Sequence, residues 1–285
     1  MNLFKFPIPN FNDKSKSTIF WRHMRFYSRK FLYHPQVKFL EKTLNMKGNE
    51  HLKNFFSNRP DACYNVTRRF CDKSFSANER VKTLIYDVNK GLESFKFLPQ
   101  DQIIFKFDED FELYLGSNRH VSEEGFWALS LRYQNAPIEQ CCFCFTLDNK
   151  LLISCIQGYQ YSDFNVLDIN KIFTKKCYGL RPIALLIECI KMLCVSLKLD
   201  ATLGVHEKNQ IRSQKGEDKG YFVDYQKIWL ENGGKLVKIN NHLYYELSHK
   251  RKNLEEIPSS KRSMYKKRFA ILEEIKQALD QSLFI

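Results

Sequence analysis

Residues 179–197 read GLRPIALLIECIKMLCVSL, and from position 183 onward the only charged residues in this stretch are Glu188 and Lys191. Pro182 fits the first position of a helix because that position needs no backbone N–H. A helix that is apolar on nearly all sides is buried rather than laid on a surface. The stretch therefore predicts a long helix at the centre of the fold.

The segments before this helix have the composition of strands. Short polar turns, such as the one at Asp148-Asn149, separate apolar runs at 103–107, 111–115, 126–133, 139–147 and 151–156. Apolar runs joined by short turns are typical of an antiparallel meander. We therefore expect a meander that leads into the buried helix.

The segments after the helix predict a short buried strand at 201–205, a helix at 224–231, and a hairpin formed by 235–239 and 243–247. Asn232-Gly-Gly is a helix-stop signal between the second helix and the hairpin. The predicted fold class is α+β, with a mixed and mostly antiparallel central sheet around the long buried helix.

Helical segments are also expected at both ends of the chain. The N-terminal ones cover 18–33 and 78–95, and a basic C-terminal helix begins near Lys261. The expected organisation is a basic helical region at 1–100, an α/β core at 101–248, and a C-terminal helix at 249–285 that packs on the core.

The first of these helices is amphipathic in an unusual way. Four apolar residues share one face and three arginines share the other: Phe20, Met24, Tyr27 and Phe31 against Arg22, Arg25 and Arg29. Pro35 predicts the end of the helix, because the residue before a proline avoids the helical region. Either the apolar face packs on the domain with the arginines in water, or the helix lies on anionic lipid.

Basic charge is concentrated at the two ends of the chain. The 285 residues include 45 Lys+Arg and 32 Asp+Glu, for a net charge of +13. Residues 1–80 hold 16 basic and six acidic side chains, and residues 249–268 hold eight and two. This distribution favours an acidic carrier protein or an anionic membrane surface as partner. We expect no specific nucleic-acid interface, because the aromatic residues of 18–33 form an apolar stripe rather than a stacking platform. The oligomeric state stays open.

The nine cysteines indicate a reducing compartment. Their number is odd and most lie in apolar runs, where a thiol behaves as a small hydrophobe. No zinc-type ligand spacing is present, so no metal site is expected. The N-terminal segment lacks an apolar signal core, and no run is long enough to span a membrane. We expect a cytoplasmic protein with a peripheral position on the inner membrane as one option.

The order of elements is similar to that of the Gcn5-related N-acyltransferase family. That family carries a Gln/Arg-x-x-Gly-x-Gly/Ala loop before its long helix, and the matching stretch here is Lys176-Cys-Tyr-Gly179-Leu-Arg181. Arg181 stands where the family has a small residue. The resemblance implies that an acyl-CoA or acyl carrier protein thioester binds at the helix N-terminus. The implied donor-binding residues are Lys175, Lys176, Gly179, Leu180 and Arg181.

The catalytic pattern of that family is only partly present. Its last helix often ends in Tyr-x-x-x-Gly-Phe with the tyrosine as general acid, whereas this chain has Trp229 at the matching position. Tyr225, one turn earlier, is the candidate substitute. His206 and Glu207, after the predicted strand at 201–205, correspond loosely to acidic or water-binding groups of that family, and His206 suits general-base work. A single histidine without a visible partner nevertheless favours an ordinary loop residue at position 206.

A closer resemblance covers about residues 60–280. The motifs Glu124-Gly125, Ile156-Gln157-Gly158, Gly179-Leu-Arg-Pro182, Leu203-Gly-Val205 and Tyr225-x-x-x-Trp229 look like the VirK/YbjX family of bacterial envelope-associated proteins. The resemblance implies a setting in virulence, surface-protein display and tolerance of antimicrobial peptides, but no reaction. Three functions stay open: an acyltransferase that modifies an envelope component, a catalytically silent binding module, and a membrane-associated accessory factor.

Overall fold

The computed structural model describes residues 3–12, 15–96, 101–118, 121–213 and 223–284. The helices in these residues are α1 (Lys16–Leu32), α2 (His34–Leu44), α3 (Glu50–Asn58), α4 (Pro60–Tyr64), α5 (Ala77–Ser94), α6 (Val166–Lys176), α7 (Pro182–Ser196), α8 (Tyr225–Glu231) and α9 (Ser259–Gln281). The strands are β1 (Gln102–Lys106), β2 (Phe111–Ser117), β3 (Trp127–Tyr133), β4 (Ala136–Phe145), β5 (Leu151–Gly158), β6 (Thr202–Val205), β7 (Gly234–Ile239) and β8 (His242–Leu247). Two single turns of 3-10 helix are η1 (Ser122–Glu124) and η2 (Leu254–Glu256).

The strands form one sheet in the order β1-β2-β3-β4-β5-β6-β8-β7. Neighbouring strands are antiparallel, except β5 and β6, which are parallel. Two-residue turns at Gln134-Asn135 and Asn240-Asn241 join β3 to β4 and β7 to β8, with positive φ at all four residues. Positive φ at both turn positions matches the twist of a tight hairpin. The predicted α+β class with a mixed, mostly antiparallel sheet is confirmed.

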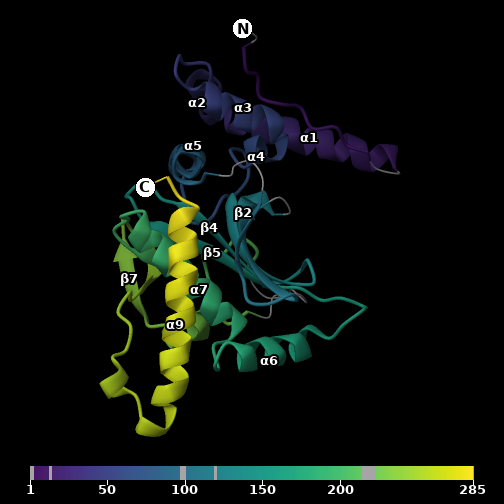
Figure 1. Ribbon diagram of the computed structural model, residues 1–285. Helices are drawn as coiled ribbons and strands as arrows, with labels where there is room; N and C mark the ends of the chain where they lie inside the picture. Colours follow the sequence, from purple (N-terminus) through teal and green to yellow (C-terminus); the bar gives the residue numbers. More distant parts are fainter. Residues whose placement is uncertain (1–2, 13–14, 97–100, 119–120, 214–222, 285) are drawn as a thin grey trace.

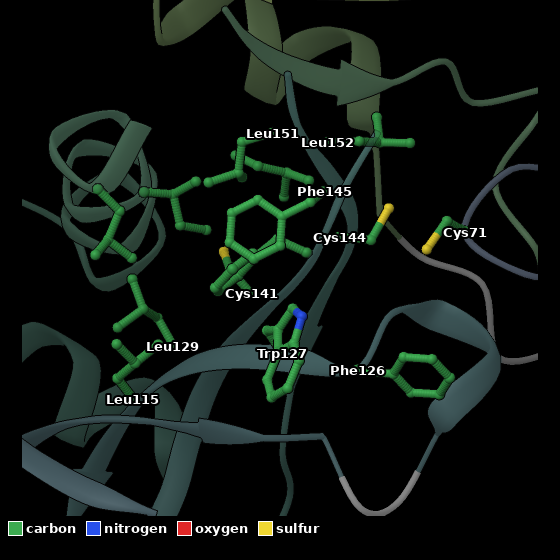
Figure 2. Close-up of a cluster of buried hydrophobic side chains, with 14 of the residues drawn as sticks. Cys71, Leu115, Phe126, Trp127, Leu129, Cys141, Cys144, Phe145, Leu151 and Leu152 are labelled. Carbon is green, nitrogen blue, oxygen red and sulfur yellow. The ribbon is translucent and has the colours of Figure 1, made fainter. Parts of the chain in front are cut away.

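The helix α7 is the predicted central helix. Ten of its 15 residues are buried, and it packs against β3, β4 and β6 as well as α6 and α9. Figure 1 shows the long helix α9 beside α7, so α7 lies between α9 and the sheet. Figure 2 shows the core of the sheet, where Trp127, Phe145 and Leu151 from three adjacent strands gather with no exposed surface.

The N-terminal helices share the core of the sheet. The carboxylate of Asp87 on α5 accepts hydrogen bonds from Trp127 Nε1 at 2.9 Å and from the Phe145 backbone N–H at 2.7 Å. Burial raises the pKa of Asp87 well above its ordinary value. One cluster of buried hydrophobic side chains includes residues from both ends of the chain, the first being Phe4 and the last Leu283. Helices α1 to α5 lie together at one end of the molecule (Figure 1).

The orientation of α1 corrects one expectation. The buried residue of α1 is Phe26, whose ring packs on Phe6 and Tyr64, while Phe31 is 86% exposed. Arg29, on the side opposite to Phe31, is half-buried. The predicted docking of the apolar stripe is therefore wrong, whereas Arg22 and Arg25 are exposed as that interpretation expected. The helix is anchored from its arginine side because Phe26, and not the predicted stripe, meets the aromatic residues of the domain.

Four helices lie outside the predicted pattern: α2, α3, α4 and α6. The prediction that Pro35 ends the first helix is close, since α1 stops at Leu32. Pro35 itself stands in the first turn of α2, where its missing N–H costs nothing. The same residue that stops one helix therefore starts the next.

Candidate functional site

The parallel strands β5 and β6 separate from each other. They pair only from Leu151 to Ile153 on β5 and from Thr202 to Gly204 on β6. The strand β5 then continues along β4 as far as Gly158. This separation leaves the edge of β5 beyond Ile153 without a neighbouring strand.

The inner end of the gap between the two strands is filled by α8. The hydroxyl of Tyr225 accepts a hydrogen bond from the Ile156 N–H at 3.1 Å, and Trp229 Nε1 donates to the Val205 carbonyl at 2.8 Å. A Cβ atom on Gly204 would lie 2.5 Å from the Trp229 ring, so only glycine fits under that indole. The helix thus holds β5 with one side chain and β6 with another.

Beyond Tyr225 the separation opens into a cavity of about 1200 Å³. Its lining includes Ile156, Gly158 and Tyr159 from the end of β5, together with Glu124 and Tyr225. A second cavity of about 550 Å³ lies at the N-terminus of α7. These two cavities are called the strand cavity and the helix cavity below.

Glu139 on β4 lines both cavities. It faces Gly158 across the strand pair and is 8% exposed. Its Oε1 accepts a 3.2 Å hydrogen bond from Asn170 Nδ2 on α6, and its Oε2 is buried without a partner. Burial raises the pKa of Glu139 to about 7. A carboxyl that titrates near neutrality beside a cavity is suited to general base catalysis.

A second buried carboxyl, that of Glu124 in η1, lines the strand cavity. It is 2% exposed, it accepts a 2.9 Å hydrogen bond from Gln210 Nε2, and Arg212 Nε lies 3.6 Å away. Burial raises its pKa despite these partners. Sequence reasoning did not place either carboxyl among the candidate site residues, although Glu124 is part of a family motif. The available signal was a glutamate at 139 at the start of the apolar run that includes Cys141 and Phe143.

The predicted donor-binding residues are only partly together. Lys175, Gly179 and Arg181 line the helix cavity. Lys176 forms an ion pair with Asp108 instead, and Leu180 is buried in the core.

The backbone amides of the bend between α6 and α7 are not available to the donor that was expected to bind there. The N–H groups of Tyr178, Gly179 and Leu180 donate to carbonyls at Lys175, Thr174 and Cys177, so these three amides cap α6. The side chain of Arg268 on α9 donates to the Tyr178 carbonyl at 2.7 Å from the outside. Positive polarity at the helix cavity therefore comes from side chains and from the first turn of α7, where Ile183 and Ala184 lie in the lining.

The predicted catalytic residues occupy two places. Tyr225 lines the strand cavity, whereas His206 and Glu207 line neither of the two cavities. His206 is 6% exposed, its Nδ1 accepts from the Lys208 N–H at 3.2 Å, and its Nε2 lies 3.4 Å from a Glu207 oxygen. Its ring stacks on Tyr245 at 5.9 Å between centroids. His206 is therefore a histidine packed against its neighbours at the end of β6.

Two further features are absent from the described part of the chain. Among its residues, no group of three or more histidine, cysteine, aspartate or glutamate side chains is placed to hold a metal ion. None of its helices is both long and apolar enough to cross a membrane.

Comparison with known proteins gives the family. Residues 15–281 match the family model described as "Protein of unknown function (DUF535)". An uncharacterized protein of Haemophilus influenzae is 32% identical over 278 residues, which cover 92% of this chain and 89% of that protein. A Mannheimia haemolytica protein named "Membrane protein LapB" is 34% identical over 229 residues, or 74% of this chain and 96% of that protein.

A more distant match is the Escherichia coli protein YbjX, 30% identical over 105 residues, which cover 36% of this chain and 32% of that protein. No solved structure matches the chain. The family model spans nearly the whole chain and the matches include YbjX, so the resemblance to the VirK/YbjX group is confirmed. The chain belongs to the DUF535 family.

Proposed function

We propose that the protein transfers an acyl group from a thioester donor, carried on coenzyme A or on an acyl carrier protein, to an amine or hydroxyl of an envelope component. The observation that carries the proposal is the position of Glu139. Its buried carboxyl borders both the cavity beside the free edge of β5 and the cavity at the N-terminus of α7. A donor that lies across both cavities brings its reactive carbonyl close to a base.

The free edge of β5 offers backbone partners to such a donor. The Tyr159 N–H donates to the Ile138 carbonyl on β4. Because backbone groups alternate in direction along a strand, those of Gly158 point to the opposite side, where β6 has diverged. An extended donor arm with amide groups can pair with this edge as an added strand does.

The helix cavity suits the phosphate groups of the donor. Lys175 and Arg181 carry positive charge in its lining, and the first turn of α7 directs the positive end of its dipole there. The guanidinium of Arg181 is planar and can donate two parallel hydrogen bonds to the oxygens of one phosphate group.

Glu139 acts as the general base in this scheme. The acceptor amine or hydroxyl attacks the thioester carbonyl carbon, and its proton passes to the Glu139 carboxylate. The carbon–sulfur bond then breaks, the acyl group stays on the acceptor, and the thiolate takes up a proton. Tyr225 is the candidate donor of that proton because it lines the same cavity. Since the pKa of Glu139 is about 7, both of its protonation states are populated near neutral pH.

The setting of the reaction rests on the family. A relative carries the words "membrane protein" in its name, which supports an acceptor at the envelope. All nine cysteines are free and buried, which supports a reducing compartment on the cytoplasmic side. A modified envelope would also account for the predicted link to antimicrobial-peptide tolerance.

The test is calorimetric titration with coenzyme A, long-chain acyl-CoA and acylated carrier protein, followed by transfer assays with membrane extracts. We expect at least one donor to bind. We expect Glu139→Gln to keep donor binding while transfer falls about 100-fold or more. Glu112→Gln is the matched control, because Glu112 is also 8% exposed in a strand but lines neither cavity. Failure of every donor to bind would overturn the proposal.

A catalytically silent binding module is the second candidate, and one observation favours it. Tyr225 already occupies the backbone groups of Ile156, so part of the free edge is not available to a ligand. Under this alternative a donor binds with the same affinity to the wild type and to Glu139→Gln, and no acyl group is transferred by either protein.

A further inference from the structure

We infer that the exposed aromatic face of α1 docks the protein onto an anionic membrane surface. Six large apolar side chains of this helix are between 47% and 86% exposed: Phe20, Trp21, Met24, Tyr27, Phe31 and Leu32. They cover an arc of one helix that is 17 residues, or about 25 Å, long. A contiguous apolar surface of this kind on a protein marks an interaction site.

The packing of α1 fixes which face is exposed. Phe26 is buried against Phe6 and Tyr64, and the Lys30 ammonium lies 5.7 Å from the Phe6 ring centroid. These contacts lie on the side of the helix away from Phe31. In Figure 1, α1 lies at the outer edge of the N-terminal layer, which leaves its free face accessible to a broad surface.

The charge beside this face is positive. The helix has no acidic residue, and Arg22, Arg25 and Arg29 line a cavity of about 410 Å³ together with Arg68. Within the described residues, no ion pair involves Arg25, Arg29 or Arg68. Burial and the neighbouring charges of Arg68 and Arg25 lower the pKa of Arg29. The positive potential of these three arginines attracts external anions.

Helical spacing brings the two features together at one edge. Trp21, Arg25 and Leu32 fall on neighbouring positions around the helix, at steps of four and seven residues. Arg25 is therefore next to the exposed apolar arc and can extend to lipid phosphates while the aromatic side chains enter the headgroup boundary. Apolar and aromatic side chains on one face with arginines beside them are typical of helices that lie in the interface of an anionic bilayer.

The same charge disfavours a second copy of the chain as the occupant. Pairing two α1 faces would bring two arginine clusters close together, and residues 1–80 carry 16 basic against six acidic side chains. An anionic membrane offers both the apolar boundary and the counter-charge, so we commit to it.

Tryptophan fluorescence gives a direct test. The chain has three tryptophans, of which Trp127 and Trp229 have no exposed surface while Trp21 is 67% exposed. We expect vesicles of phosphatidylcholine with phosphatidylglycerol to shift the emission to shorter wavelength, and vesicles of phosphatidylcholine alone to leave it unchanged. Trp21→Phe removes the shift, which assigns it to α1. High salt weakens the binding.

Co-sedimentation with the same vesicles tests the face itself. Phe20→Ser combined with Phe31→Ser lowers the bound fraction at least tenfold, and Arg25→Gln combined with Arg29→Gln lowers it for anionic vesicles. Leu167→Ser combined with Leu236→Ser is the matched control, since these apolar residues are 70% and 55% exposed outside α1. Circular dichroism checks that each variant is folded.

Two outcomes would overturn the inference. One is equal binding of anionic vesicles by the wild type and by the Phe20/Phe31 variant. The other is a concentration-dependent dimer in sedimentation velocity that the Phe20/Phe31 variant abolishes, with Trp21 already shielded in the absence of lipid. Neither outcome bears on donor binding or on Glu139, so this inference and the acyl-transfer proposal fail separately.

Discussion

The hydroxyl of Tyr225 on α8 accepts a 3.1 Å hydrogen bond from the backbone N–H of Ile156 on β5. At Ile156 the strand β5 has already lost its pairing with β6, which ends at Ile153. The Tyr225 hydroxyl therefore accepts the hydrogen bond that a carbonyl of a neighbouring strand would otherwise accept. Because an unpaired buried N–H is costly, this contact stabilises the divergence of the two strands on which the strand cavity depends.

Replacement of Tyr225 by phenylalanine tests that contact. The Ile156 N–H loses its acceptor in a buried position, so we expect Tyr225→Phe to lower the free energy of unfolding by about 1–3 kcal/mol. Urea denaturation followed by circular dichroism measures the change. Tyr27→Phe is the control, because Tyr27 is 48% exposed and its replacement has almost no effect on unfolding. An unchanged midpoint for Tyr225→Phe would show that Ile156 finds another acceptor.

A glycine substitution tests the fit of α8 against β6. An alanine Cβ at Gly204 would lie 2.5 Å from the Trp229 ring, and that ring is fully buried. We expect Gly204→Ala to destabilise the fold by about 1–3 kcal/mol or more, as overpacked cores do. Gly158→Ala is the control, since its Cβ would meet the nearest atom of Glu139 at 3.5 Å, an ordinary contact. Thermal unfolding of both variants decides the point, and equal melting temperatures would contradict the expected clash.

The sheet and its central helix could be predicted from the sequence because their signals are local. Residues 183–197 are almost uniformly apolar, and α7 runs from Pro182 to Ser196. The hairpin predicted at 235–239 and 243–247 is found as β7 and β8, each within one residue of its predicted start. Consecutive apolar residues indicate the burial of α7 on all sides, and consecutive turn residues indicate the tight turn between β7 and β8.

The missed features depend on contacts between distant segments. The helices α2, α3 and α4 have 11, nine and five residues, and helices this short are stable only through packing. The buried state of Glu139 depends on Asn170 of α6 and on the strand pair with Gly158. The face of α1 that is exposed depends on where Phe26 meets Phe6. The contacts with Asn170 and Phe6 have no signature in the local sequence, and the local sign of the burial of Glu139 is only its place at the start of an apolar run.

The contact between α9 and the bend before α7 gives a third prediction. Arg268 donates to the Tyr178 carbonyl through Nε at 3.2 Å and Nη2 at 2.7 Å, and its guanidinium lies 4.2 Å from the Tyr265 ring centroid. We expect Arg268→Ala to cost about 1.5–3 kcal/mol of unfolding free energy, because the bonds involve a charged donor. Lys266→Ala, on an exposed part of the same helix, is the control and leaves stability unchanged. If both variants unfold alike, Arg268 does not hold the bend.

The titration of Glu139 makes stability depend on pH. Burial raises its pKa from 4.5 to about 7, so the folded state binds the proton more tightly than the unfolded state does. The stabilisation from the protonated form is fully present below pH 4.5 and is lost as the pH rises to about 7. The shift corresponds to about 3 kcal/mol at most. Denaturation of the wild type and of Glu139→Gln across this range isolates the contribution from those of other buried carboxyls.

The expected difference has a definite sign. Raising the pH from 4.5 to 7 lowers the stability of the wild type relative to Glu139→Gln, because the variant has no carboxyl to ionise. Glu112→Gln provides the opposite control, since the hydrogen bond from Lys106 holds the pKa of Glu112 below its ordinary value. The contribution of Glu112 is therefore lost as the pH falls. Parallel pH profiles for the wild type and Glu139→Gln would mean that Glu139 has the same pKa in the folded protein as in water. Its carboxylate would then be too weak a base to accept a proton from the acceptor at neutral pH.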